Sequence, residues 1–349
     1  MTAKYAKDQP DGFTNRIERI TIVGASGTVG SPIVEELLAT GKHTVTALTR
    51  PGSTNSLPAG LESIAVSYDT EDGESALVDA LRGQQVLIIC LSPQAAPGTH
   101  HRLVVAAAKA GVPYVVPNGW GWLWLDDEEK RKKSMHGEVV YQNLKDVEAQ
   151  GVSSWICVKC SVWYEFSLYM GRRNYGFTLP DKKVTFFDDG EKKIWTTTTR
   201  QVGRAVAKLF SLKELPEDEN DQDLTVARWK NKELRVGSFN VSQKDMLDSV
   251  HRVIGTTDEE WTITKEPSVA RRQRGLKLMA TDPSHGFVIV LYSSIFLPDE
   301  VGFFGKATFD EDEVDNRLLG LPKEDLDEAT KRAVDTAAKM SSDCLAQLH

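Results

Sequence analysis

A glycine-rich segment near the N-terminus has the residue types and the spacing to hold a phosphate-bearing ligand. Gly24-Ala25-Ser26-Gly27-Thr28-Val29-Gly30 follows a short apolar run and precedes apolar residues at helical spacing. In this context the first glycine allows a tight turn, the second admits a pyrophosphate, and the third lets the helix pack closely. Backbone N–H groups at the helix start then face the phosphates. The segment predicts a dinucleotide site; a purely structural glycine turn is the alternative.

The end of the next apolar run indicates which dinucleotide would bind. A site for NAD places an acidic residue there to hold the ribose hydroxyls. In this chain Thr46-Ala47-Leu48-Thr49-Arg50 has no carboxylate and ends in an arginine. A guanidinium binds a 2′-phosphate through paired, charge-assisted hydrogen bonds. Arg50 and the missing acid therefore favour NADP(H) as the cofactor, with an ordinary surface arginine as the alternative.

The elements that must position these residues follow an alternating order. Apolar runs predict strands at 19–23, 44–48, 61–66, 85–91, 112–116 and 154–159. Helical spacing between them, at 28–40 and 100–110, indicates βαβ units around a parallel sheet. We therefore predict an α/β fold, a Rossmann-type doubly wound sheet with a smaller, discontinuous α/β substrate domain. The first domain would take residues 1–165 with a return at 194–213, and the second 166–193 and 214–349.

Composition argues against several classes of partner. The chain has 349 residues and a net charge of -8, whereas binding to nucleic acid requires a basic surface. No apolar run is long enough to span a bilayer, and the first residues lack the apolar core of a secretory signal. Cys157 and Cys160 lie in a predicted strand and would point to opposite faces, so we expect no metal site. A cytoplasmic protein with a small-molecule substrate is the expectation.

The sequence resembles a known family beyond the glycine loop. The run from Ile20 to Arg50 is similar to the atypical short-chain dehydrogenases of the NmrA-like and isoflavone-reductase-like group. Pro117-Asn118-Gly119-Trp120-Gly121 resembles that family's Pro-Ser-Glu-Phe-Gly segment, and the similarity extends past residue 250. Trp163-Tyr164-Glu165 resembles a turn of the fungal branch tied to secondary metabolism. The resemblance implies an NADPH-dependent reductase of a small aromatic or unsaturated metabolite; a homodimer is left open.

The same resemblance implies which residues contact the cofactor. The loop glycines, with Ser26, Thr28 and Val29, would hold the pyrophosphate, and Arg50 would hold the 2′-phosphate. Asp69, after the third predicted strand, would lie near the adenine. The residues expected to line the ribose and nicotinamide side follow the fourth and fifth strands: Leu91, Ser92, Pro93 and Asn118.

The catalytic position departs from the family pattern. The resemblance implies a proton-transferring lysine on the helix after the fifth strand, but ungapped counts from Gly121 and Gly151 both reach Val140. Tyr141 and Lys145 have the Tyr-x-x-x-Lys spacing, in which lysine lowers the tyrosine pKa, although chance co-occurrence is the alternative. His136 is a third candidate, or else a surface histidine. The missing lysine favours an NmrA-like redox sensor, whereas the aromatic residues favour a reductase, and a redox-neutral isomerase or cyclase is the third alternative.

Two aromatic groups could form the walls of a substrate site. Trp120, Trp122 and Trp124 alternate along an extended segment, so their rings would lie on one side. They predict a flat wall for an aromatic substrate; a hydrophobic core between domains is the alternative. A charged block at 126–133, either a flap or a solvated helix start, separates them from the opposite wall. That wall would consist of Trp163, Tyr164, Phe166 and Tyr169.

Overall fold

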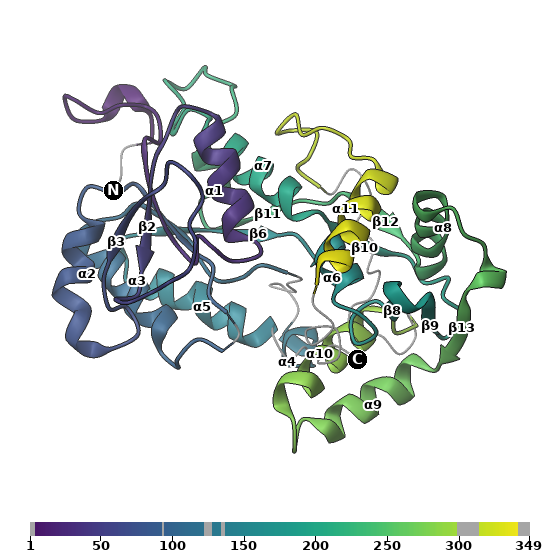
Figure 1. The fold of residues 1–349 in the computed structure, drawn as a ribbon. Coiled ribbons are helices and arrows are strands. Elements are labelled where there is room, and N and C mark those ends of the chain that lie inside the picture. The colour runs from purple at the N-terminus through teal and green to yellow at the C-terminus, as the bar shows by residue number, and fades with distance from the viewer. Residues whose placement is uncertain (1–3, 93, 122–127, 134–136, 299–313, 341–349) are drawn as a thin grey trace.

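A computed structural model describes residues 4–92, 94–121, 128–133, 137–298 and 314–340 of the chain. The chain forms two lobes, a larger one that holds the N-terminal half and a smaller one that holds the C-terminal helices (Figure 1). Among the described residues, no helix is both long and apolar enough to cross a bilayer.

The larger lobe is built on a parallel sheet of seven strands in the order β11-β6-β5-β4-β1-β2-β3. Its strands are β1 (Arg19–Val23), β2 (Thr44–Thr49), β3 (Glu62–Ala65), β4 (Val86–Ile89), β5 (Tyr114–Val116), β6 (Ser154–Lys159) and β11 (Lys232–Arg235). The order reverses direction between β1 and β4. Ligands of such sheets bind beyond the carboxyl ends of the strands at this switch point. The predicted Rossmann-type fold is therefore confirmed.

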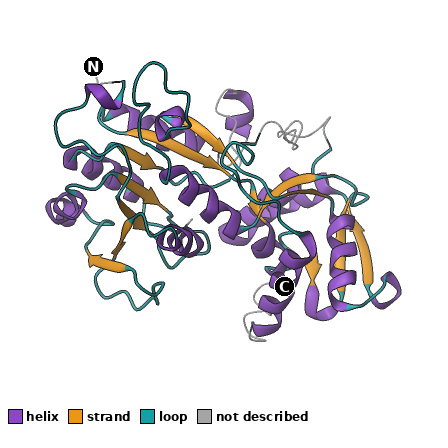
Figure 2. Ribbon diagram, turned by 90° about the horizontal axis from the view of Figure 1, so that it is seen from above, coloured by secondary structure: helices purple, strands orange, loops and turns teal. Residues whose placement is uncertain are grey.

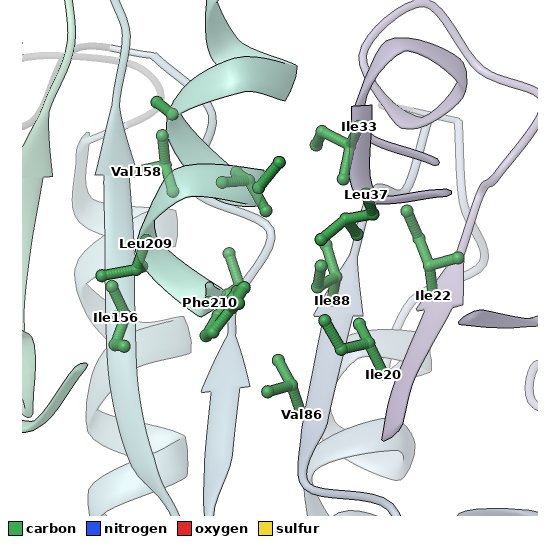
Figure 3. Packing of buried hydrophobic residues seen from close by; sticks show 14 of the residues in the cluster. Ile20, Ile22, Ile33, Leu37, Val86, Ile88, Ile156, Val158, Leu209 and Phe210 are labelled. Carbon is green, nitrogen blue, oxygen red and sulfur yellow. The ribbon is translucent and has the colours of Figure 1, made fainter. Parts of the chain in front are cut away.

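Helices cover both faces of the large sheet, which explains why its central strands are apolar throughout. One face carries α1 (Gly30–Ala39) and α7 (Thr199–Phe210), which also contact each other. In Figure 3, Ile33, Leu37 and Leu209 on these helices pack around side chains of β1, β4 and β6. The other face carries α2 (Glu74–Leu81), α3 (Thr99–Ala110) and α5 (Gly137–Ala149), with the short α4 (Glu128–Lys133) before α5.

The smaller lobe contains two sheets of three strands each (Figure 2). The first joins β7 (Val162–Trp163), β10 (Ile194–Thr197) and β12 (Phe239–Val241), and the second joins β8 (Phe177–Thr178), β9 (Lys183–Phe187) and β13 (Thr262–Glu266). Its helices are α6 (Tyr164–Tyr169), α8 (Gln243–Ile254), α9 (Ser268–Leu278), α10 (Pro283–Ile295) and α11 (Leu326–Lys339). Buried side chains of its strands and of α6, α8, α10 and α11 share a core that is rich in aromatic residues.

Two domain assignments are corrected, and one helix is found that was not predicted. The 194–213 segment returns to the large lobe only through α7, because β10 pairs with β7 and β12 instead. Conversely, β11 lies within the stretch assigned to the smaller domain but pairs with β6 in the large sheet. Only Leu234 of that polar strand is fully buried, so its sequence gave no strand signal. Helix α2, with Leu77, Val78 and Leu81 buried, was not predicted.

Candidate functional site

The glycine loop fits tightly between the carboxyl ends of β1 and β4. Gly24 has a φ of +81°, and a Cβ added there would lie 2.0 Å from the carbonyl oxygen of Cys90, directly after β4. A Cβ on Gly30 would lie 2.0 Å from the carbonyl oxygen of Gly24. Both positions therefore require glycine, for separate reasons: a positive φ with a close approach at Gly24, and close packing of α1 on the loop at Gly30.

The start of α1 presents backbone polar groups at the switch point. Val29 is the N-cap residue, and no side chain among the described residues accepts a hydrogen bond from the first turn. Ser26, Gly27 and Thr28 are exposed, whereas Val29 is buried. The Ser31 N–H already donates to the carbonyl oxygen of Gly27 and Pro32 has no N–H, so an anion here would meet the positive dipole end and the other backbone N–H groups of the loop and helix start. The loop therefore fits a pyrophosphate.

Arg50 lies directly after β2, next to the loop that follows β3. Its Nη1 is 3.9 Å from Oδ2 of Asp69, and the Arg50 side chain is 61% exposed. A guanidinium this accessible can bind a further anion from solvent. The loop that contains Asp69 is also contacted by Arg102 on α3, whose Nη2 donates a 2.8 Å hydrogen bond to the carbonyl oxygen of Asp69. No sequence pattern indicated the Arg102 contact.

The residues expected on the nicotinamide side connect the ends of β4 and β5. Asn118 Oδ1 accepts a 3.1 Å hydrogen bond from the Leu91 N–H, and Trp120 Nε1 donates one of 2.8 Å to the carbonyl oxygen of Ile89. The Ser92 hydroxyl donates to Gln94 Oε1. Asn118 therefore holds the loop that contains Leu91 and Ser92. Pro93 lies outside the described residues.

One half-buried and one buried thiol follow the ends of β4 and β6. Cys90 follows β4, and Cys160 follows β6. Burial raises the pKa of the Cys160 thiol to about 12 and that of the Cys90 thiol still further, so both are protonated at neutral pH and poor nucleophiles. Cys157 and Cys160 join different core clusters on opposite faces of the sheet, as predicted.

The family lysine position and the Tyr-x-x-x-Lys pair lie on different faces of α5. Val140 is fully buried and faces Gly119. The Lys145 ammonium lies 5.4 Å from the centre of the Tyr141 ring and 2.6 Å from Glu148 Oε2. Tyr141 and Lys145 line a polar cavity of about 620 Å³ beside β6 and β11, and β5 separates these strands from β4. His136 lies outside the described residues.

The aromatic groups divide into a half-buried row and a core residue. Trp163, Phe166 and Tyr169 form the row on and beside α6, with ring centres 5.8 Å and 5.6 Å apart in edge-to-face contacts. Trp163 and Trp120 both pack against the core beneath the switch point. The substrate role predicted for Tyr164 is corrected, because this side chain is fully buried and its hydroxyl bonds to Thr330 Oγ1 at 2.6 Å. Trp122 and Trp124 lie outside the described residues.

Comparisons with known proteins agree with this geometry. Residues 24–147 match a family model described as NAD(P)H-binding. The oxidoreductase aprR of Aspergillus flavus is 25% identical over 319 residues, which cover 89% of this chain and 96% of that protein.

Solved structures extend the similarity to nearly the whole fold. An isoflavone reductase superimposes with a TM-score of 0.64 at 18% identity, over 90% of this chain and 99% of its own. An NADPH-dependent quinone oxidoreductase from Escherichia coli, solved with NADPH, gives 0.64 at 19% identity over 90% and 99%. The chain therefore carries an NAD(P)H-binding domain on the fold of the isoflavone-reductase-like proteins.

Proposed function

We propose that this protein is an NADPH-dependent reductase of a small aromatic or unsaturated metabolite. The observation that carries the proposal is the switch point itself, where Gly24 and Gly30 form a close-packed loop below the uncapped start of α1. Arg50, at the end of β2, supplies the cation that a 2′-phosphate requires and an NAD site lacks. The oxidoreductase name of the fungal relative and the NADPH bound in the quinone oxidoreductase support the same function.

Each part of the chain has a separate task in this proposal. The bound cofactor supplies a hydride equivalent. The α1 N-terminus and Arg50 hold its phosphates, and Leu91 and Ser92, positioned by Asn118, border its nicotinamide end. The half-buried rings of Trp163, Phe166 and Tyr169 would contact a flat substrate. The Tyr141 hydroxyl is our candidate for delivering the proton, although the cavity that it lines with Lys145 lies beside β6 and β11 and not beside β4.

A second function, a cofactor-binding redox sensor, is favoured by one observation. Val140 occupies the position where the resemblance implies a lysine, and it is fully buried against Gly119. A protein that binds the cofactor without using it needs no proton donor there. A sensor would instead require different affinities for NADPH and NADP+, since only differential binding can shift a conformational equilibrium.

Titration calorimetry and a turnover assay distinguish these functions. Arg50→Ala should weaken NADPH binding much more than NADH binding, because only NADPH carries the 2′-phosphate. Arg82→Ala, which removes another exposed arginine paired with an aspartate, is the matched control and should change neither affinity. Equal losses of NADPH and NADH affinity in Arg50→Ala would reject the 2′-phosphate assignment.

Turnover is measured as loss of NADPH absorbance with a panel of quinones and aromatic enones. A reductase oxidises NADPH with at least one compound, and Tyr141→Phe lowers kcat while leaving the Kd for NADPH unchanged. A chain that turns over none of them and binds NADPH and NADP+ with affinities differing tenfold or more is a sensor.

A further inference from the structure

We infer that Asp69 limits the preference of this protein for NADPH over NADH, because it is a fixed anion on the guanidinium that receives the 2′-phosphate. The inference rests on the proposed function, which takes Arg50 as the ligand of that phosphate. Asp69 Oδ2 and Arg50 Nη1 are 3.9 Å apart. The two anions, one from the protein and one from the cofactor, would therefore share a single guanidinium.

The side chain of Arg102 on α3 holds the backbone around Asp69 in place. The Arg102 guanidinium donates to the carbonyl oxygens of Asp69 at 2.8 Å, Pro97 at 3.2 Å and Tyr68 at 3.4 Å. These acceptors belong to two loops, one after β3 and one before α3. Since one planar guanidinium connects both loops, the Asp69 backbone cannot move away without breaking charge-assisted hydrogen bonds.

A residue of its own loop also holds the Asp69 carboxylate. The Ser67 hydroxyl donates a 3.3 Å hydrogen bond to Asp69 Oδ1. The loop then closes tightly, because a Cβ on Gly73 would lie 1.9 Å from the carbonyl oxygen of Ser67. The Asp69 side chain is 29% exposed, against 61% for Arg50. Arg50 is thus the freer partner, and the carboxylate stays in place when an anion arrives.

The charges on Asp69 and on the cofactor determine whether Asp69 strengthens or weakens the binding of NADPH. An exposed ion pair restricts its arginine only weakly. Asp69 therefore gains little phosphate affinity for the protein by orienting Arg50. A 2′-phosphate carries between one and two negative charges and is repelled by a neighbouring carboxylate. The 2′-hydroxyl of NADH carries no charge and can donate a hydrogen bond to that carboxylate. Asp69 therefore disfavours NADPH without disfavouring NADH.

Asp69→Asn tests this inference, because it removes the charge and keeps the shape and the bond from Ser67. The Kd values for NADPH, NADH and 2′-AMP are measured by titration calorimetry at two salt concentrations. The NADPH and 2′-AMP affinities should rise by about three- to tenfold at low salt and by less at high salt, with NADH affinity unchanged or reduced. Asp79→Asn, in the exposed pair with Arg82 at 2.9 Å, is the matched control and should change none of them.

Failure of the inference is distinguishable from failure of the proposed function. In an Asp69→Asn protein that is still folded, an unchanged or weaker NADPH affinity overturns the role of Asp69, while a selective NADPH loss in Arg50→Ala still supports the cofactor assignment. Equal losses of NADPH and NADH in Arg50→Ala overturn both. Thermal unfolding of Asp69→Asn shows whether the loop is intact. If that loop has unfolded, Arg102→Lys serves as the second test. This variant keeps the charge but loses the planar donor set, so it should release Asp69 and raise the affinity for NADPH. An unchanged or lower NADPH affinity in Arg102→Lys then overturns the inference.

Discussion

Val140 and Gly119 are in such close contact that a Cβ on Gly119 would lie 2.9 Å from Val140 Cγ1 and 3.0 Å from the Cys157 thiol. This contact fixes the first turns of α5 against the loop after β5. The resemblance implies a lysine at position 140, but the valine found there packs in the core. Proton transfer, if this chain performs it, therefore depends on another face of α5 or on another element.

Val140→Lys should destabilise the protein without adding activity. An ammonium at this fully buried and closely packed site beside Gly119 and Cys157 would lose its hydration, so the free energy of unfolding should fall by about 3 kcal/mol or more. Urea denaturation measures this. Val139→Lys is the control, because Val139 is 54% exposed and the change should stay within about 0.5 kcal/mol. A Val140→Lys protein with wild-type stability and new NADPH oxidation would contradict this account.

Gly24→Ala should abolish cofactor binding. An alanine at position 24 would have to adopt a left-handed backbone conformation. Its methyl group would also overlap the carbonyl of Cys90, a backbone group that cannot rotate away. We expect a stability loss above about 2 kcal/mol and no NADPH binding by calorimetry. Gly41→Ala shares the positive φ of +64° but meets nothing within 4 Å. It should cost only about 1–2 kcal/mol and bind NADPH normally; the same binding defect in both variants would count against the close-approach argument.

The free energy of unfolding should decrease as the pH falls, because His100 is largely buried. This side chain is 11% exposed, and neither ring nitrogen has a hydrogen-bond partner among the residues that the structure describes. Burial lowers its pKa from 6.5 to about 4, although Asp146 raises it in part. Between these values the unfolded chain binds the proton and the folded chain does not. The contribution of His100 is therefore complete above pH 6.5, and up to about 3 kcal/mol is lost as the pH falls to 4.

Urea denaturation across this pH range checks the His100 effect. His100→Gln should flatten the decrease in unfolding free energy, since glutamine does not titrate. His285→Gln, at an exposed histidine beside Asp282, should leave the slope of the wild type. An unchanged slope in His100→Gln would show that other groups cause the acid sensitivity.

Tyr164→Phe should change stability and not substrate affinity. The Tyr164 hydroxyl bonds to Thr330 at 2.6 Å inside the core of the smaller lobe, so its loss should cost about 1–2 kcal/mol. Phe166→Leu, in the half-buried row, should instead raise KM for an aromatic substrate. Thermal unfolding and steady-state kinetics separate the two effects. A higher KM with unchanged stability in Tyr164→Phe would return this residue to the substrate site.

Local sequence patterns were sufficient to predict strands β1 to β6 of the large sheet and the phosphate loop. Each central strand is buried on both faces, so it reads as an apolar run, and the glycine loop is a local strand–turn–helix signal. The polar strand β11 and helix α2 were not predicted. Strand β11 depends on pairing with β6, more than 70 residues earlier in the chain, and one buried leucine is too weak a pattern for a strand.

The sequence alone thus determined the parallel α/β fold, the phosphate loop and an arginine at the position that selects a cofactor. The surroundings of these residues became visible only in the folded chain, where Gly24 faces Cys90, Arg102 holds the Asp69 loop and Tyr164 lies in the core. The reason is physical. A turn or a strand is encoded by neighbours in the chain, whereas a contact such as Arg102 to Asp69, 33 positions apart, exists only once the strands between them have aligned.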